Sequence, residues 1–98
     1  MSGAVTDEQA DSQGSVALAG IVGPHELELA SRRLRQLGEG GVDTLVADFA
    51  AATSIDVDGL DVLLDATSAL QERGVDIAVV PSWAEEVLYL TGRWSKGT

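Results

Sequence analysis

The sequence predicts a single layered α/β domain, and three observations indicate it. The chain has 98 residues, a length that suits one hydrophobic core and leaves little for a second. Hydrophobic residues make up 45% of it, and most are aliphatic. Short apolar runs alternate with segments in which apolar residues recur every three or four positions. Buried strands that alternate with helices give this pattern.

The first third of the chain predicts a tail, a strand and a helix. Residues 1–13 are polar and acidic, which favours a mobile tail, although the AVT within them could begin a short edge strand. Residues 15–22 form an apolar run that ends at a glycine and a proline, as expected of a strand leaving a sheet. Residues 25–37 have helical spacing, with Glu28 placed to pair with Arg32 one turn later. A glycine-rich turn follows.

The middle of the chain predicts a strand, a helix and a second strand. Residues 44–49 (TLVADF) and 75–80 (VDIAVV) are apolar runs typical of buried strands. Residues 59–72 have the periodicity of a helix, and their inward-facing residues are expected to be Leu60, Leu63, Leu64, Thr67 and Leu70. This order predicts a parallel pair of strands joined by a crossover.

A last helix is predicted directly after the final strand. A proline stops the strand, and Ser82 with Glu85 three residues later is a capping-box signature for a helix start. Gly92 is expected at the end of this helix. Trp83 and Trp94 flank it, and we expect both to pack in the core or at its edge rather than to bind a ligand.

Composition and charge exclude several classes of function. Sixteen acidic and six basic residues give a formal net charge of -10, so nucleic acids and anionic membrane surfaces would repel the chain, and a basic protein surface is the expected partner. The absence of cysteine excludes a disulfide, a thiolate metal site and a cysteine nucleophile. No apolar stretch is long enough to span a membrane. We therefore expect a cytoplasmic protein with no direct membrane binding.

Four aspartates lie within ten residues where the strand predicted at 44–49 gives way to the following helix. In α/β folds this join lies at the carboxyl edge of the sheet, where sites usually form. Asp56 or Asp58 could serve there as a helix cap. Asp58, Asp61 and Asp65 fall on one stripe opposite the leucines, with Glu72 further along the helix. This acidic ridge is either a solvated face or a docking surface for a basic partner.

The sequence predicts neither catalysis nor a bound metal or cofactor. Counted from Asp56, a calcium-binding loop would need an oxygen ligand and a glycine where Leu60 and Asp61 stand. A magnesium-dependent phosphoacceptor at these aspartates would want a lysine near the last strand, but the only lysine is Lys96. That alternative depends on magnesium binding. The single histidine, His25, stands beside a proline at a helix start, where a surface or capping role is commoner than catalysis.

Residues 46–80, VADFAAATSIDVDGLDVLLDATSALQERGVDIAVV, resemble the STAS domain, the fold of bacterial anti-sigma-factor antagonists. Members of that family have a strand, the turn Ile-Asp-Ser-Ser-Gly-Leu, a helix, a glycine-bounded turn and a second strand at this place. Gly20 and LeuTyrLeuThrGly at 88–92 are further matches, and the resemblance covers residues 14–94. It implies a small mixed four-stranded sheet with helices packed on it, preceded by the tail or edge strand of residues 1–13 and followed by a tail at 95–98.

In that family the second serine of the turn is phosphorylated by the partner anti-sigma factor, a serine kinase, and only the unphosphorylated form binds it. Asp56 matches the family's aspartate, Val57 the first serine, Asp58 the phosphoacceptor and Gly59 the glycine. The acceptor hydroxyl is therefore absent. Gly23 also stands where the family often has an aspartate. Asp58 places about one negative charge where a phosphoserine would carry roughly one and a half to two.

The resemblance implies a non-catalytic regulatory module whose partner is an anti-sigma factor or a related kinase-fold regulator. Its expected contact residues are Asp56, Val57, Asp58, Gly59, Leu60, Asp61 and Asp65. Asp58 either imitates the phosphorylated, released state or is read directly by Arg or Lys of a changed partner. Gly59 either admits the partner's backbone or relieves crowding at the helix start. The alternative function is that of an accessory subunit in a lipid-transport ATPase complex.

Overall fold

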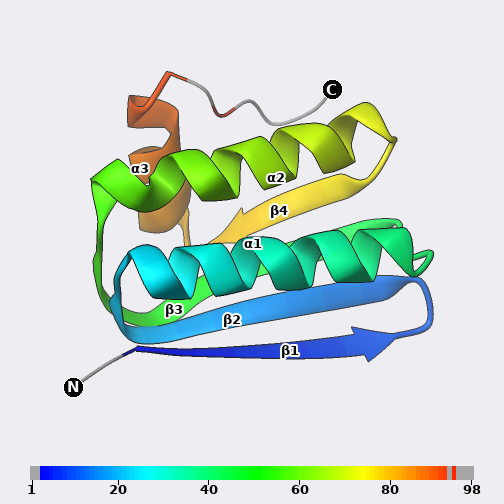
Figure 1. Cartoon of the computed structure of the whole chain (residues 1–98), viewed down its shortest axis with the longest axis horizontal. Coiled ribbons are helices and arrows are strands. Elements are labelled where there is room, and N and C mark those ends of the chain that lie inside the picture. Colours follow the sequence, from blue (N-terminus) through cyan, green and yellow to red (C-terminus); the bar gives the residue numbers. More distant parts are fainter. Residues whose placement is uncertain (1–2, 93, 95–98) are drawn as a thin grey trace.

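The computed structural model describes residues 3–92 and 94, in which four strands form one mixed sheet (Figure 1). The strands are β1 (Ala4–Ala10), β2 (Gln13–Val22), β3 (Thr44–Ile55) and β4 (Asp76–Val80), and they lie in the order β1-β2-β3-β4. β1 is antiparallel to β2, whereas β2, β3 and β4 run parallel to one another. The mixed four-stranded sheet and the parallel pair expected from the sequence are confirmed.

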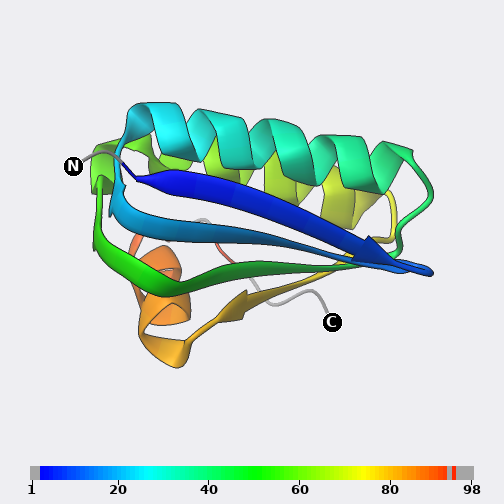
Figure 2. The same cartoon turned by 90° about the horizontal axis from the view of Figure 1, so that it is seen from below.

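The helices cover the two faces of the sheet unequally. α1 (Pro24–Glu39) and α2 (Leu60–Glu72) lie side by side on one face, and the shorter α3 (Ser82–Leu90) lies on the other, at the end where β3 and β4 stop (Figure 2). A 3-10 turn, η1 (Val57–Gly59), joins β3 to α2. None of the helices in the described part of the chain is long and apolar enough to cross a membrane.

The core lies between the sheet and the pair α1 and α2. Every residue predicted to face inward from α2 is buried, and so are the apolar residues of α1 that recur at helical spacing: Leu27, Ala30, Leu34 and Leu37. Alternate residues of the strands meet them, among them Val16 and Leu18 of β2 and Leu45 and Ala47 of β3. Each fully buried aliphatic side chain of this kind contributes about 1.5–3 kcal/mol relative to an exposed one.

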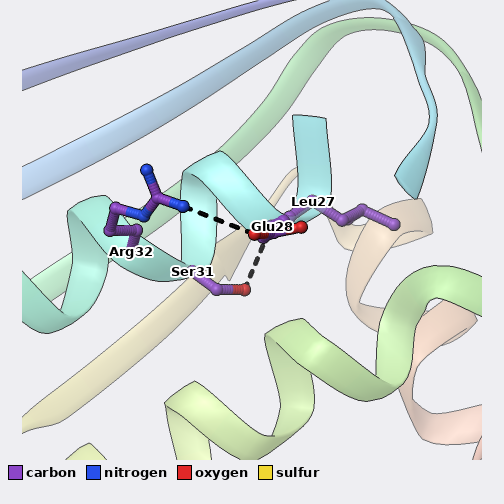
Figure 3. Close-up of polar contacts among 4 residues, drawn as sticks. All are labelled: Leu27, Glu28, Ser31 and Arg32. Carbon is purple, nitrogen blue, oxygen red and sulfur yellow. Dashed lines mark hydrogen bonds and ion pairs between the residues drawn. The ribbon is translucent and has the colours of Figure 1, made fainter. Parts of the chain in front are cut away.

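Two polar interactions join residues one helical turn apart in α1 (Figure 3). The guanidinium of Arg32 lies 3.3 Å from Oε1 of Glu28, which confirms the pair expected one turn apart. Ser31 is buried, and its hydroxyl group donates a hydrogen bond of 2.7 Å to the carbonyl oxygen of Leu27. The buried face of α1 therefore contains a polar side chain whose hydrogen-bonding capacity is met within the helix.

The N-terminal segment is a strand rather than a mobile tail. Residues 4–10 pair with β2 along their whole length, and Val5 packs against the core. Nη1 of Arg33 donates a hydrogen bond of 2.6 Å to the carboxylate of Asp7, which ties β1 to α1. All residues of this strand except Val5 are exposed. The strand is therefore hard to predict from the sequence, because it lacks the alternation of buried and exposed residues that a half-buried strand shows. Residues 95–98, expected to form a tail, lie outside the described residues.

Two further boundaries differ from the sequence prediction. β3 continues to Ile55, because its small residues after Phe49 keep pairing with β2. The capping box predicted at Ser82 and Glu85 is wrong. The N-cap of α3 is Pro81, with no side-chain cap hydrogen bond, and the carboxylate of Glu85 instead accepts a hydrogen bond of 3.4 Å from the indole of Trp94.

Candidate functional site

The aspartate-rich turn lies at the carboxyl edge of the parallel strands, as predicted. Asp56 follows the last residue of β3, and its backbone N-H donates a 2.8 Å hydrogen bond to the carbonyl of Val22 at the end of β2. The N-H of Gly59 donates a 3.1 Å hydrogen bond to the carbonyl of Asp56, which closes η1. The turn is therefore fastened to the sheet at its first residue and leads directly into α2.

The acidic ridge has the geometry that the sequence predicts. The side chains of Asp58, Asp61, Asp65 and Glu72 are all exposed, while the leucines on the opposite side of α2 are buried. Asp58 lies inside η1 and is presented to solvent rather than turned toward the sheet. Within the described part of the chain no arginine forms an ion pair with Asp58. This carboxylate is accessible to an approaching protein.

Neither Asp56 nor Asp58 acts as a hydrogen-bonding helix cap, so that prediction is wrong. Asp56 occupies the N-cap of η1 without a side-chain cap hydrogen bond, and the N-cap of α2 is Gly59. A glycine at the N-cap of α2 has no side chain that could bond to the first N-H groups of the helix. Asp58 and Asp61 still lie in first turns, where the helix dipole favours a negative charge.

Leu60 must be removed from the expected contact residues. Its side chain is only 1% exposed and belongs to the hydrophobic core, because it begins the buried stripe of α2. Val57, by contrast, is 58% exposed. The apolar part of the turn that a partner can reach is therefore Val57 alone.

Two exposed apolar residues near the site were missed in the sequence. Val62, which is 44% exposed, follows Asp61 on α2, and Ile21 is exposed near the end of β2, paired in register with Ser54 of β3. Val62 could have been found, since it lies one position off the leucine stripe. Ile21 could not, because it continues an apolar run whose other residues suggest a fully buried strand.

The start of α1 packs closely on η1, and this contact explains Gly59. A Cβ atom at Gly59 would lie 3.0 Å from Cδ1 of Leu27 and 3.5 Å from Cα of Pro24. Of the two explanations offered for this glycine, the structure supports relief of crowding. Gly23 serves as the N-cap of α1, and its N-H donates a 2.9 Å hydrogen bond to Oε1 of Glu26.

The remaining sequence candidates do not gather at this turn into a recognisable chemical centre. His25 is exposed in the first turn of α1. Over residues 3–92 and 94, no three histidine, aspartate or glutamate side chains are arranged so that they could hold a metal ion. Lys96 lies outside the described residues. What the turn offers is an exposed combination of carboxylates and a valine, which suits contact with another protein.

A mixed four-stranded sheet with a helix pair on one face and an exposed turn from strand to helix defines a small α/β domain. The model of the STAS domain family matches residues 11–85. The chain therefore belongs to the STAS domain family, as its sequence indicated.

Solved structures share the fold at low sequence identity. The unphosphorylated form of the anti-sigma factor antagonist SpoIIAA has 18% identity and a TM-score of 0.70, with 93% of this chain and 86% of that one covered. The phosphorylated form of SpoIIAA, a cell fate determinant of Bacillus, has 17% identity and the same TM-score of 0.70, with coverage of 91% and 84%. A crystal structure of Mglu has 24% identity and a TM-score of 0.69. The match covers 78% of this chain but only 19% of the Mglu chain. No match is found among curated proteins.

Proposed function

We propose that this STAS domain is a non-catalytic regulatory module that binds a protein partner through its turn and acidic ridge. The residues that would make the contact are Asp56, Val57, Asp58, Gly59, Asp61 and Asp65, here named the α2 docking surface. The partner would be an anti-sigma factor or a related kinase-fold regulator. The observation that carries the proposal is the exposed carboxylate of Asp58 at the position where the family resemblance implies a phosphorylated serine.

A permanent charge at this position would replace a removable one. SpoIIAA is described in unphosphorylated and phosphorylated forms, whereas Asp58 offers no hydroxyl to a serine kinase. Its carboxylate is exposed beside an exposed valine, Val57, and interfaces commonly combine apolar contacts with charge-assisted hydrogen bonds. This combination favours a partner that reads the carboxylate with Arg or Lys over one that Asp58 only repels.

The first experiment measures binding of an anti-sigma factor by titration calorimetry. If the charge is read directly, Asp58→Asn weakens binding about tenfold or more, because the partner's cation is left buried and unpaired. If Asp58 imitates the released state, the same variant binds more tightly. Asp76→Asn is the matched control, since Asp76 is exposed at the start of β4, away from the carboxyl edge. If the two variants change the affinity equally, the carboxylate of Asp58 has no specific role in binding and the proposal is wrong.

A second experiment tests whether the switch is fixed. The wild-type chain, incubated with the same regulator and Mg-ATP, should gain no phosphate by intact mass spectrometry, and Asp58→Ser should gain one. Stoichiometric phosphorylation of the wild type at Thr53 or Ser54 would contradict the fixed charge. Co-purification with a membrane ATPase instead of a kinase-fold regulator would assign the chain to the alternative function of an accessory subunit.

A further inference from the structure

α3 has a stripe of apolar side chains, most of which are exposed. Trp83 is 42% exposed and Leu90 is 87% exposed, and both lie on the same face of the helix as the half-buried Val87. Val80 is exposed at the end of β4, directly before Pro81, the N-cap of α3. We call Val80, Trp83, Val87 and Leu90 the α3 stripe. Large apolar side chains gathered on one short helix are uncommon on a surface unless something covers them.

The α3 stripe is separate from the α2 docking surface. α2 lies with α1 on one face of the sheet and α3 lies on the other, so that the sheet stands between them (Figure 2). Ala84 and Leu88 are the buried residues of α3, and they fix its orientation. Val87 lies at the border of this buried face, and Trp83 and Leu90 are exposed beyond it. A protein bound to the stripe would leave the ridge of α2 accessible.

The charges around the stripe are all of one sign in the described part of the chain. α3 carries Glu85 and Glu86 and no basic residue. The strand register pairs Asp48 with Val80, so this carboxylate lies next to the stripe on the face of the sheet away from α1 and α2. Glu8 and Asp76 share that face but lie further off, on the opposite edge strand and at the other end of β4. The arginines that the structure describes lie elsewhere, at positions 32, 33 and 35 in α1 and 73 at the end of α2.

We infer that the α3 stripe is a second docking surface, which binds a segment of a protein partner that has an apolar face flanked by Lys or Arg. The apolar face would cover Trp83 and Leu90, and the cations would meet Glu86 and Asp48. A second copy of this chain fits poorly, because it would bring the same carboxylates against each other. This inference does not depend on the function proposed for the α2 docking surface.

The test uses a synthetic helical peptide with leucines on one face and lysines on the other as the probe, added to the full chain. In a ¹H-¹⁵N NMR titration we expect the shifts to cluster at residues 80–90, and in a separate titration we expect the tryptophan fluorescence to move to shorter wavelength. Trp83→Ser and Leu90→Ser should each weaken binding about tenfold, since aromatic and leucine anchors dominate such contacts. Glu86→Lys should weaken it severalfold. A scrambled peptide of the same charge, without an apolar face, should bind far more weakly.

The matched control is Val62→Ser, which removes a similarly exposed apolar side chain (44%) from the other side of the sheet. It should leave the probe's affinity unchanged. Shifts centred on α2, or an equal loss with Val62→Ser, would overturn the inference. The inference would also be overturned if the chain alone dimerises in analytical ultracentrifugation and Leu90→Ser abolishes the dimer. The stripe would then be occupied by a second copy.

Discussion

Gly59 shows at the scale of a single residue how packing, rather than backbone conformation, selects an amino acid. Its φ is -81°, which any residue can adopt, so conformational freedom is not the reason. An added Cβ would lie 3.0 Å from Cδ1 of Leu27 and 3.2 Å from Oδ2 of Asp56. Leu27 is fully buried, and the dense packing of a protein interior leaves such a side chain little room to yield.

Gly59→Ala is therefore expected to lower the free energy of unfolding by about 1–3 kcal/mol, the usual cost of overpacking a dense contact. Urea denaturation followed by circular dichroism measures it. Val57→Ala, a change at an exposed neighbour, should stay within about 0.5 kcal/mol of the wild type. If Gly59→Ala stays within that same range, α1 and η1 do not pack as closely as the structure shows.

The sequence predicted the residues of the site better than their individual roles. Asp58, Asp61 and Asp65 could be placed on one exposed stripe because helical periodicity alone decides which face a residue occupies. Leu60 is expected to face inward from helical periodicity and to contact a partner from its place in the family's turn, and the structure buries it. Such a position belongs to two patterns at once, and only tertiary packing decides between them.

At the scale of elements, periodicity predicted the helices well and the sheet edges less well. α1 and α2 were found because their buried residues repeat every turn. For β1 the sequence leaves a mobile tail and an edge strand open, because an edge strand with one partner and mostly exposed side chains has no pattern of burial to display. The extension of β3 after Phe49 escaped prediction because small residues such as Ala51 and Ala52 are typical of loops as well as strands.

The attachment of β1 to α1 leads to a measurable prediction for the ion pair between Asp7 and Arg33. Their atoms are 2.6 Å apart and both side chains are partly exposed, so the interaction is expected to contribute about 0.5–1 kcal/mol. A double-mutant cycle with Asp7→Asn and Arg33→Gln, measured by urea denaturation, isolates this coupling. A coupling energy of zero would mean that β1 is held by its backbone pairing and Val5 alone.

The start of α1 leads to a second prediction at this scale. Glu26 accepts the hydrogen bond from the N-H of Gly23 and places a negative charge in the first turn, so Glu26→Ala should lower the free energy of unfolding by about 1 kcal/mol. Glu28→Ala removes only the exposed pair with Arg32 and should cost about 0.3–0.5 kcal/mol. Equal losses in the two variants would show that the hydrogen bond from Gly23 to Glu26 contributes no more to stability than a surface charge pair.

At the scale of the whole molecule, acidic residues outnumber basic ones and the formal net charge is -10. The described arginines are confined to α1 and the end of α2, while both proposed docking surfaces are acidic. Like charges on one side of a domain destabilise the folded state through mutual repulsion, and the same charges attract a basic partner. The two effects have the same physical origin, so added salt should change them in opposite directions.

We therefore expect sodium chloride to stabilise the fold while it weakens docking. Raising its concentration from about 0.05 to 0.5 M shortens the Debye length from above 10 Å to below it, so the repulsion among exposed carboxylates is screened and the free energy of unfolding rises by about 1 kcal/mol. A variant in which Glu8, Asp76 and Glu86 are changed to their amides should show a smaller rise, because it removes three exposed charges from the α3 side of the sheet. Chloride is used rather than sulfate, since sulfate strengthens apolar burial by exclusion from the surface. If salt instead destabilises the wild-type chain, or if the triple variant responds as strongly as the wild type, then the acidic surface is balanced within the fold and does not stand ready for a basic partner.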